Sequence, residues 1–253
     1  GLHKAVSSNY EDDDYLLLLE HDSVITSGRS SKENNLLVSQ ETLNHMNIDF
    51  FETDRGGDVT FHGEGQLIGY PIIRLQDPKK VVPFVRSIEN ILIQSLNDLS
   101  IDSFTKEDDT GVWTSKGKIA SIGIKVSKWT TYHGFSLNIF DKLEGFDLIN
   151  PCGNDAERIT SIQSFNDKVS FDEVSRIVSD NFFKLFEYTE VDEQFSQFTP
   201  KQLKSKKEFN IDKMVAAGVF KPSGKGIPIT IKGVLPTEPK RPEWMKVKAN
   251  LGN

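Results

Sequence analysis

The sequence predicts an α/β (α+β) protein, in which short strands form a sheet and amphipathic helices cover it. Apolar runs such as 15–20 and 66–75 have the length and composition of buried strands. The stretches 81–99 and 171–186 repeat apolar residues at spacings of three and four, which is typical of a helix with one buried face. Glycines between 56 and 65 add tight turns to this pattern.

The elements follow from local patterns along the chain. We expect strands at 15–20, 23–26, 48–52, 58–61, 66–75, 111–114, 118–126, 132–139 and 159–162. Helices are expected at 40–46, 81–99, 142–146, 171–186 and 211–217. Ser39 and Ser170 precede two of these helices and are residues that cap helix N-termini well.

Composition bounds the domain organisation and the partners. The 253 residues suit one large domain, and the 37% hydrophobic content is enough for a core. A net charge of −7 argues against nucleic-acid and anionic-membrane binding. Residues 201–253 carry a net charge of +8 and the rest −15. We therefore expect a flexible N-terminus at 1–14, a catalytic domain at 15–198 and a basic C-terminal extension at 199–253.

Cysteine and histidine usage excludes several kinds of site. Cys152 is the single cysteine, so no disulfide forms within the chain, which suits a reducing compartment such as the cytosol or the mitochondrial matrix. One cysteine and five scattered histidines give no zinc cluster, and we expect no metal. Apolar runs are too short for a membrane span, and no secretory signal is visible at Gly1.

Two side chains stand out as candidates for chemistry. Cys152 lies in the turn Asn150-Pro-Cys-Gly153, which presents a side chain, although a lone cysteine is more often a small buried hydrophobe. Its thiol needs a nearby cation to be a thiolate at neutral pH. Lys118 begins a strand rich in small residues, and its alternative interpretation is a solvated strand end. His62 and His133 each precede a glycine, and both also fit ordinary structural histidines.

Several segments together resemble one enzyme family. They are Arg55-Gly-Gly-Asp-Val-Thr-Phe-His62-Gly, Lys118-Ile-Ala-Ser-Ile-Gly123, His133-Gly-Phe-Ser-Leu-Asn138 and Pro151-Cys152-Gly153. Their order and spacing resemble lipoyl(octanoyl) transferases, over about residues 15–186. Glu64 stands where that family usually has proline, and Ser27 where it usually has leucine.

The resemblance implies a fold and an activity. It implies the fold of biotin and lipoate protein ligases, a mixed sheet with packed helices. It implies transfer of octanoyl from acyl carrier protein to a lysine of lipoyl domains, such as those of H protein and dehydrogenase E2 subunits. Cys152 would form the thioester, and Lys118 would lower its pKa and act as acid and base. No cofactor is implied, and we expect a monomer.

The resemblance also assigns a binding site and a location. The residues that it implies for substrate binding are Arg55, Gly56, Gly57, Asp58, Val59, Thr60, Phe61, His62, Ser121, Ile122, Gly123, Gly134, Phe135 and Ser136. His133 and Asn138 would support them. We expect a eukaryotic mitochondrial form in the matrix, with its presequence absent from this chain, or a cytoplasmic enzyme if the source is bacterial.

Three alternatives stay open. An ATP-dependent lipoate–protein ligase would share the fold without needing a cysteine nucleophile. An amidotransferase between lipoylated proteins would share the Cys/Lys chemistry, and a binding module would keep only the fold. The segment 240–248 is similar to a Pro-Glu-Trp-Leu-Lys segment of lipoyl synthases, whose cysteine clusters are absent. The basic extension is therefore interpreted as an electrostatic guide for acidic protein substrates.

Overall fold

The computed structural model describes residues 3, 7, 14–75, 80–150, 158–186, 190–195 and 229–234. The strands are β1 Asp14–Leu19, β2 Val24–Ser27, β3 Asp49–Glu52, β4 Thr60–His62, β5 Gln66–Ile72, β6 Gly111–Thr114, β7 Gly117–Ser127, β8 Thr130–Asn138, β9 Glu190–Phe195 and β10 Ile229–Val234. The helices are α2 Gln40–His45, α3 Val81–Asp98 and α4 Phe171–Phe186, with 3₁₀ turns η1 Glu33–Asn35 and η3 Glu144–Leu148.

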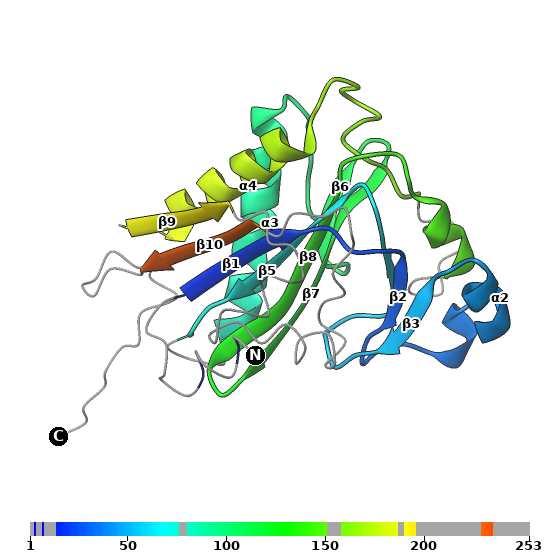
Figure 1. Cartoon of the computed structure of the whole chain (residues 1–253). Helices are drawn as coiled ribbons and strands as arrows, with labels where there is room; N and C mark the ends of the chain where they lie inside the picture. Colours follow the sequence, from blue (N-terminus) through cyan, green and yellow to red (C-terminus); the bar gives the residue numbers. More distant parts are fainter. Residues whose placement is uncertain are drawn as a thin grey trace.

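The described strands form a large and a small sheet (Figure 1). The large sheet has the order β6-β7-β8-β5-β1-β10-β9, and its neighbours are antiparallel. The small sheet has the order β3-β2-β4, where β2 runs parallel to β3 and antiparallel to β4. The predicted fold class, a mixed sheet with helices packed against it, is confirmed. The parallel pair of strands lies in the small sheet.

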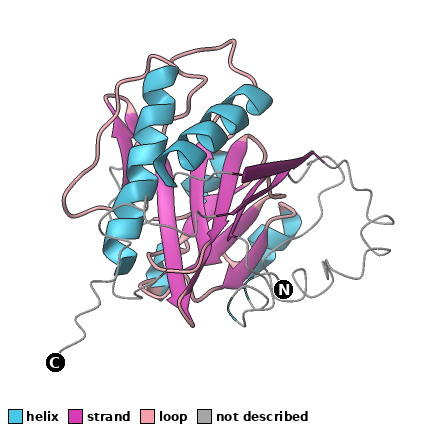
Figure 2. Cartoon of the chain, turned by 90° about the vertical axis from the view of Figure 1, so that its left-hand side faces the viewer, coloured by secondary structure: helices cyan, strands magenta, loops and turns pink. Residues whose placement is uncertain are grey.

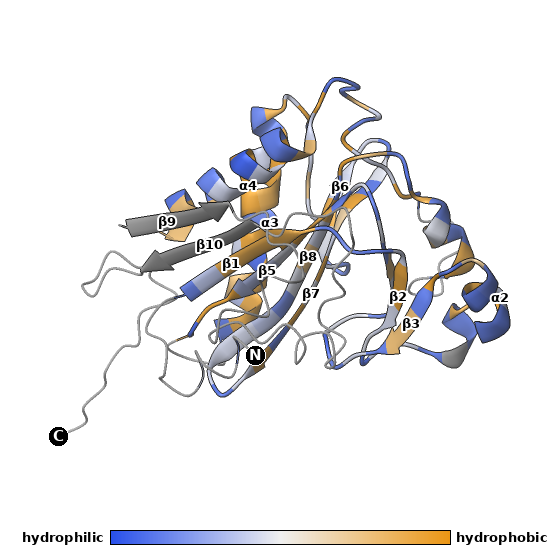
Figure 3. Cartoon of the chain, viewed as in Figure 1, coloured by the Kyte–Doolittle hydropathy of each residue, from blue (hydrophilic) through white to orange (hydrophobic). Residues whose placement is uncertain are grey.

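Helices α3 and α4 cover one face of the large sheet (Figure 2). Their apolar sides turn toward the strands, as the hydropathy colouring shows (Figure 3). Phe84, Phe182 and Phe186 are at most 1% exposed and pack in one cluster with inward side chains of β1, β5, β7 and β8. Each such side chain contributes roughly 1.5–3 kcal/mol through burial. This layer fixes the sheet on which the candidate site lies.

The other face of the large sheet carries a separate apolar row and the small sheet. Tyr15, Leu17, Leu19, Ile68 and Ile72 form the row, since alternate residues of a strand point to opposite faces. The small sheet has its own core with α2. Its buried members are Ile25, Leu43, Ile48, Val59, Phe61 and Ile149. None of the helices in the described part of the chain is long and apolar enough to cross a bilayer.

Most predicted elements are found within a residue or two. Ser39 and Ser170 cap their helices, with Oγ accepting from Thr42 N and Glu173 N at 3.2 Å each. The helix expected at 142–146 is instead the 3₁₀ turn η3, where the missing Cβ of Gly145 lets Phe61 pack closely. The strand expected at 159–162 is an isolated bridge between Ile159 and Lys118. The expected helix at 211–217 lies outside the described residues.

Strands β9 and β10 are additions to the predicted elements. β10 lies in the basic extension and pairs with β1, for example Ile231 with Leu16. Its sequence, Ile229-Thr-Ile-Lys-Gly-Val234, alternates as a strand does, but the prolines on both sides made the region look like a loop. Part of the extension is thus a strand of the large sheet, while the division at 198/199 stays a prediction.

Candidate active site

The glycine-rich loop between β3 and β4 is held against the turn that follows β2. Arg29 N donates to Arg55 O, and Ser30 N to Gly57 O, both at 3.1 Å. Gly57 has a φ of 86°, which favours glycine. A Cβ at Gly28 would fall 2.3 Å from Gly57 O, so the approach of the two segments also requires glycine there.

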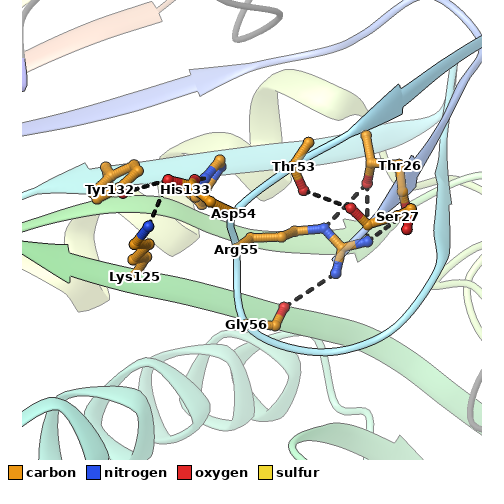
Figure 4. Close-up of polar contacts among 9 residues, drawn as sticks. All are labelled: Thr26, Ser27, Thr53, Asp54, Arg55, Gly56, Lys125, Tyr132 and His133. Carbon is orange, nitrogen blue, oxygen red and sulfur yellow. Dashed lines mark hydrogen bonds and ion pairs between the residues drawn. The ribbon is translucent and has the colours of Figure 1, made fainter. Parts of the chain in front are cut away.

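Arg55 is a buried cation that is bonded to β2. Its Nε and Nη2 donate to Thr26 Oγ1 at 3.1 and 3.0 Å, and Nη2 also donates to Thr26 O at 2.6 Å (Figure 4). Nη1 donates to Gly56 O at 3.1 Å. Burial lowers the pKa of Arg55 to about 10, while Asp58 opposes that change. Arg55 therefore stays positively charged at neutral pH.

The loop also lies directly on the large sheet. A Cβ built at Gly123 of β7 would be 2.8 Å from Gly56 O and 3.2 Å from Arg55 Cδ. A Cβ at Gly56 would in turn be 3.2 Å from Ile124 O. Two of the predicted binding segments, 55–62 and 121–123, thus meet at a contact between backbones.

Strands β7 and β8 present small side chains beside this contact. Ser121 pairs with Ser136, and Gly123 pairs with Gly134. Their neighbours Ile122 and Phe135 point the other way, into the core beneath the helices. Because side chains alternate, the predicted binding residues Ile122 and Phe135 offer only their backbone to the site.

The 58–61 segment mostly serves the small sheet. Val59 and Phe61 are buried in its core, and Thr60 is paired with Thr26. Asp58 accepts a hydrogen bond from Asn35 Nδ2 at 2.6 Å. Asp58 therefore ties the glycine loop to the 35–37 segment.

His62 is half-buried and lies beside the uncharged polar residues Gln66 and His21. Its Nδ1 is 3.1 Å from Gln66 Oε1, and its ring centroid is 6.1 Å from that of His21. His21 Nε2 is hydrogen-bonded to the Tyr70 hydroxyl at 2.5 Å. Burial lowers the pKa of His21 to about 4 and that of His62 to about 3, with the neighbouring His21 and Arg55 lowering the latter further. Both imidazoles are neutral at pH 7, and His62 donates through Nδ1.

Lys118 is held by a carboxylate and an aromatic ring. Its Nζ is 3.0 Å from Asp109 Oδ1 and 4.6 Å from the ring centroid of Trp113. The residue is only 9% exposed. The segment that begins at Arg158 is hydrogen-bonded to the Lys118 backbone. Lys118 N donates to Arg158 O at 2.8 Å, and Thr160 N donates to Lys118 O at 2.9 Å.

Cys152 lies outside the described residues, as do its neighbours 151–157. The described residues on both sides are bonded to the site. Asn150 N donates to Asn35 O at 2.8 Å, and Asn35 is the partner of Asp58. On the other side Asn138 Nδ2 donates to Thr160 O at 2.9 Å. The chain is therefore attached near the glycine loop at Asn150, and the next described residues are attached beside Lys118.

Sequence reasoning missed the partners that hold these residues. Thr26 and Asn35 bind Arg55 and Asp58 from 29 and 23 residues away in the chain. Asp109 binds Lys118 from nine residues away, and no spacing rule links any of these pairs. Asp54 is hydrogen-bonded to His133, the predicted supporting residue, and also to Lys125 and Tyr132. Only the position of Asp54 directly before Arg55 was a usable signal. Among the described residues, no group of His, Cys, Asp and Glu is arranged to hold a metal ion.

Comparison with protein families gives one match over most of the chain. Residues 2–183 match the family described as the lipoyl protein ligase A/B catalytic domain. A protein from Koribacter versatilis named octanoyltransferase is 46% identical over 180 residues, covering 68% of this chain and 72% of its own. An octanoyltransferase from Solibacter usitatus is 44% identical over 176 residues, covering 69% and 80%. These relatives are bacterial and give no support to the expected mitochondrial location.

Solved structures with the same fold are more distant in sequence. A bipartite lipoate protein ligase from Thermoplasma acidophilum, studied with its E2 lipoyl domain, has a TM-score of 0.64 at 17% identity and covers 88% of this chain and 91% of its own. A lipoate-protein ligase A bound with ATP has a TM-score of 0.62 at 17% identity, covering 72% and 77%. At such identities the likeness concerns the fold alone.

Proposed function

The chain belongs to the family of the lipoyl protein ligase A/B catalytic domain, and its activity is octanoyl transfer in protein lipoylation. On that basis we propose that the transfer proceeds through a thioester on Cys152, with Lys118 as acid and base. The donor is octanoyl-acyl carrier protein, and the acceptor is a lysine of a lipoyl domain.

In the first step the Cys152 thiolate attacks the carbonyl carbon of the donor thioester. The new C–Sγ bond forms as the bond to the donor sulfur breaks, and the departing thiolate takes a proton from the Lys118 ammonium. One thioester replaces another, so the step costs little free energy and is reversible. Lys118 is neutral at the end of this half of the cycle, because its proton has moved to the sulfur of the donor.

In the second step the acceptor amine attacks the acyl carbon of the Cys152 thioester. The amine must first lose a proton, since a lysine of unperturbed pKa about 10.4 is mostly charged at pH 7. That first proton goes to solvent. As the C–N bond forms, neutral Lys118 accepts the second proton of the attacking nitrogen, and the C–Sγ bond breaks to return the Cys152 thiolate. The amide product is more stable than the thioester and drives the cycle forward.

The observation that carries this proposal is the bonding on both sides of the Cys152 segment. Asn150 is connected through Asn35 to the glycine loop, and Arg158 is bonded to Lys118. Asp109 and Trp113 hold the Lys118 ammonium group beside that return. This arrangement supports a cysteine and a lysine acting in one site that Arg55–His62 and the small residues of β7 and β8 line.

The binding roles follow from chemistry as well as position. Burying the acyl chain gains about 0.8 kcal/mol per methylene, so the apolar part of the donor is a strong anchor. The paired small side chains of Ser121 and Ser136 lie beside the 55–57 loop, which itself covers Gly123, and we assign the acyl chain to the space next to the two serines. The archaeal system named with an E2 lipoyl domain supports a lipoyl domain as the acceptor.

Intact mass spectrometry after mixing with octanoyl-acyl carrier protein tests the nucleophile. We expect one added octanoyl group on the wild type and none on Cys152→Ala. Lys118→Met should be acylated far more slowly and should not pass the group to a lipoyl domain. An octanoyl adduct that persists on Cys152→Ala would remove Cys152 from the role.

A second candidate is ATP-dependent ligation of free octanoate or lipoate. The ligase structures with the same fold favour it, but the relatives above 40% identity are octanoyltransferases. Turnover of free octanoate that requires ATP would support ligation. Turnover of the acyl carrier protein thioester without any nucleotide would support transfer.

A further inference from the structure

Asp54 stands directly before the proposed binding loop and has no part in the chemistry above. Its carboxylate accepts hydrogen bonds from Lys125 Nζ at 2.6 Å, Tyr132 Oη at 2.9 Å and His133 Nε2 at 2.8 Å (Figure 4). The Asp54 side chain is 51% exposed, so the contact is no part of a packed core. Three donors from the β7–β8 hairpin converge on one carboxylate at the surface.

The two residues on either side of Asp54 in the sequence are hydrogen-bonded to the small sheet instead of the large one. Thr53 donates to Ser27 O through both N and Oγ1, at 2.8 and 3.0 Å. Arg55 donates to Thr26, also on β2, as Figure 4 shows. The loop therefore has its own attachment to the small sheet. Asp54 adds hydrogen bonds that reach the large sheet.

Strand β8 is distorted where it meets Asp54. In a regular strand Tyr132 and His133 would point to opposite faces. Here their ring centroids are 4.8 Å apart and both side chains reach Asp54. His133 has a φ of 58°, in the left-handed region that costs a non-glycine residue free energy. Strained backbone of this kind gathers at functional positions.

The groups around Asp54 keep its carboxylate ionised at neutral pH, and the ionised carboxylate can accept hydrogen bonds from its donors. Burial alone would raise the pKa of Asp54, but hydrogen bonds from His133, Lys125 and Tyr132 outweigh it and lower the pKa well below its usual value. Burial lowers the pKa of His133, although Asp54 opposes this, so its neutral ring donates through Nε2 at pH 7. Arg55 is next in sequence, and the His3 ring contacts the Tyr132 ring at a tilt of 49°, with centroids 4.5 Å apart.

We propose that Asp54 is a positioning residue, which fixes the 55–57 loop on the large sheet so that the loop is ready to bind the octanoyl donor. It acts through Arg55 and Gly56, whose atoms lie against Gly123. The proposal rests on the proposed function, because it takes this loop as part of the acyl site. Without the link, the loop stays attached to β2 but loses its fixed distance from β7.

Steady-state kinetics with octanoyl-acyl carrier protein test this role. Asp54→Ala should raise KM about tenfold while kcat changes less than about threefold, since loss of ground-state positioning acts on binding. His133→Gly suits the left-handed backbone and removes only the side chain, so it should raise KM by a smaller factor. Asp54→Glu should restore part of the loss, and Asp180→Asn, an exposed carboxylate on α4, is the matched control and should leave KM unchanged.

The double variant Asp54→Ala/His133→Gly separates a shared link from general damage. If both residues serve one link, its KM should equal that of Asp54→Ala, because coupled residues are not additive. Multiplied effects, or a wild-type KM in Asp54→Ala, would overturn the proposal. A lower melting temperature with unchanged KM would also overturn it, as would a kcat loss alone. Should Asp54→Ala fail to fold, Tyr132→Phe removes one donor and should raise KM by about twofold.

The same samples distinguish this inference from the proposed function. Every variant retains Cys152 and should still take up one octanoyl group when the donor is saturating. If the wild type itself forms no octanoyl adduct on Cys152, the proposed function fails. If the wild type is acylated and all KM values agree, only the role of Asp54 fails.

Discussion

Two histidines, the buried His21 and the half-buried His62, make the stability of the fold depend on pH. Both are neutral when folded, with pKa values near 4 and 3, because burial disfavours the charged ring. In the unfolded chain their pKa returns to about 6.5, so that state binds more protons between pH 4 and 6.5. Stability from this source is complete above pH 6.5 and falls as the pH drops toward the folded values.

Urea unfolding at pH 7 and pH 5 measures this effect. The free energy of unfolding should fall with acidification, by at most about 1.4 kcal/mol per pH unit for each histidine. His62→Gln cannot titrate and should reduce the difference between the two pH values. Asp54 does not contribute, because its lowered pKa affects stability only below about pH 4. Glu20, whose pKa burial raises, acts in the opposite direction. Equal pH dependence in wild type and His62→Gln would contradict this account.

The contact between the glycine loop and β7 belongs to the scale of elements. Gly123→Ala places a methyl group 2.8 Å from Gly56 O, a backbone atom that cannot turn away. Either the loop or the strand must shift, which should cost about 1–3 kcal/mol of unfolding free energy. KM for the octanoyl donor should rise as well, since the displaced loop carries Arg55.

Chemical unfolding and kinetics on the same preparation check that expectation. Ser127→Ala, also on β7, adds no volume and serves as the control, with a change within about 0.5 kcal/mol. Wild-type stability and KM in Gly123→Ala would show that the loop does not press on β7 in solution. A loss of stability with an unchanged KM would place the loop outside the binding site.

Local patterns predicted the elements well because their causes are local. The apolar spacing of α3 and the serine caps of α2 and α4 depend on neighbours within a few residues. The family resemblance brought Arg55, Lys118 and Gly123 into one predicted site. It could not separate Ile122 and Phe135 from Ser121 and Ser136, because strand alternation decides which side chains face the site.

The residues that position the site were beyond sequence reasoning for a different reason. Asp54 meets Lys125, Tyr132 and His133 only because a left-handed residue turns β8 locally. Asp109 meets Lys118 across a turn with no characteristic spacing. Such contacts depend on the tertiary fold, and they leave no pattern of residue spacing from which a single sequence could predict them. β10 was missed likewise, since its partner β1 is far away in the chain.

At the scale of the whole molecule, charge is divided between the body and the extension. Residues 201–253 carry a net charge of +8, against −15 for residues 1–200. Electrostatic attraction of this kind speeds the encounter with acidic partners and is screened by salt. Deleting the extension would also remove β10 from the large sheet, so deletion confuses steering with folding. A change of charge outside β10 isolates the electrostatic part.

The test replaces Lys240, Arg241, Lys246 and Lys248 by glutamate and leaves 229–234 intact. If the extension guides acidic carrier or lipoyl domains, KM for the protein substrates should rise several-fold at 20 mM salt. The difference from wild type should vanish near 0.5 M salt, because the screening length then falls to a few ångströms. Replacing the same residues by glutamine should give an intermediate KM at low salt. If the wild type and both variants have the same KM at low salt, the basic charge of the extension does not guide these substrates to the enzyme.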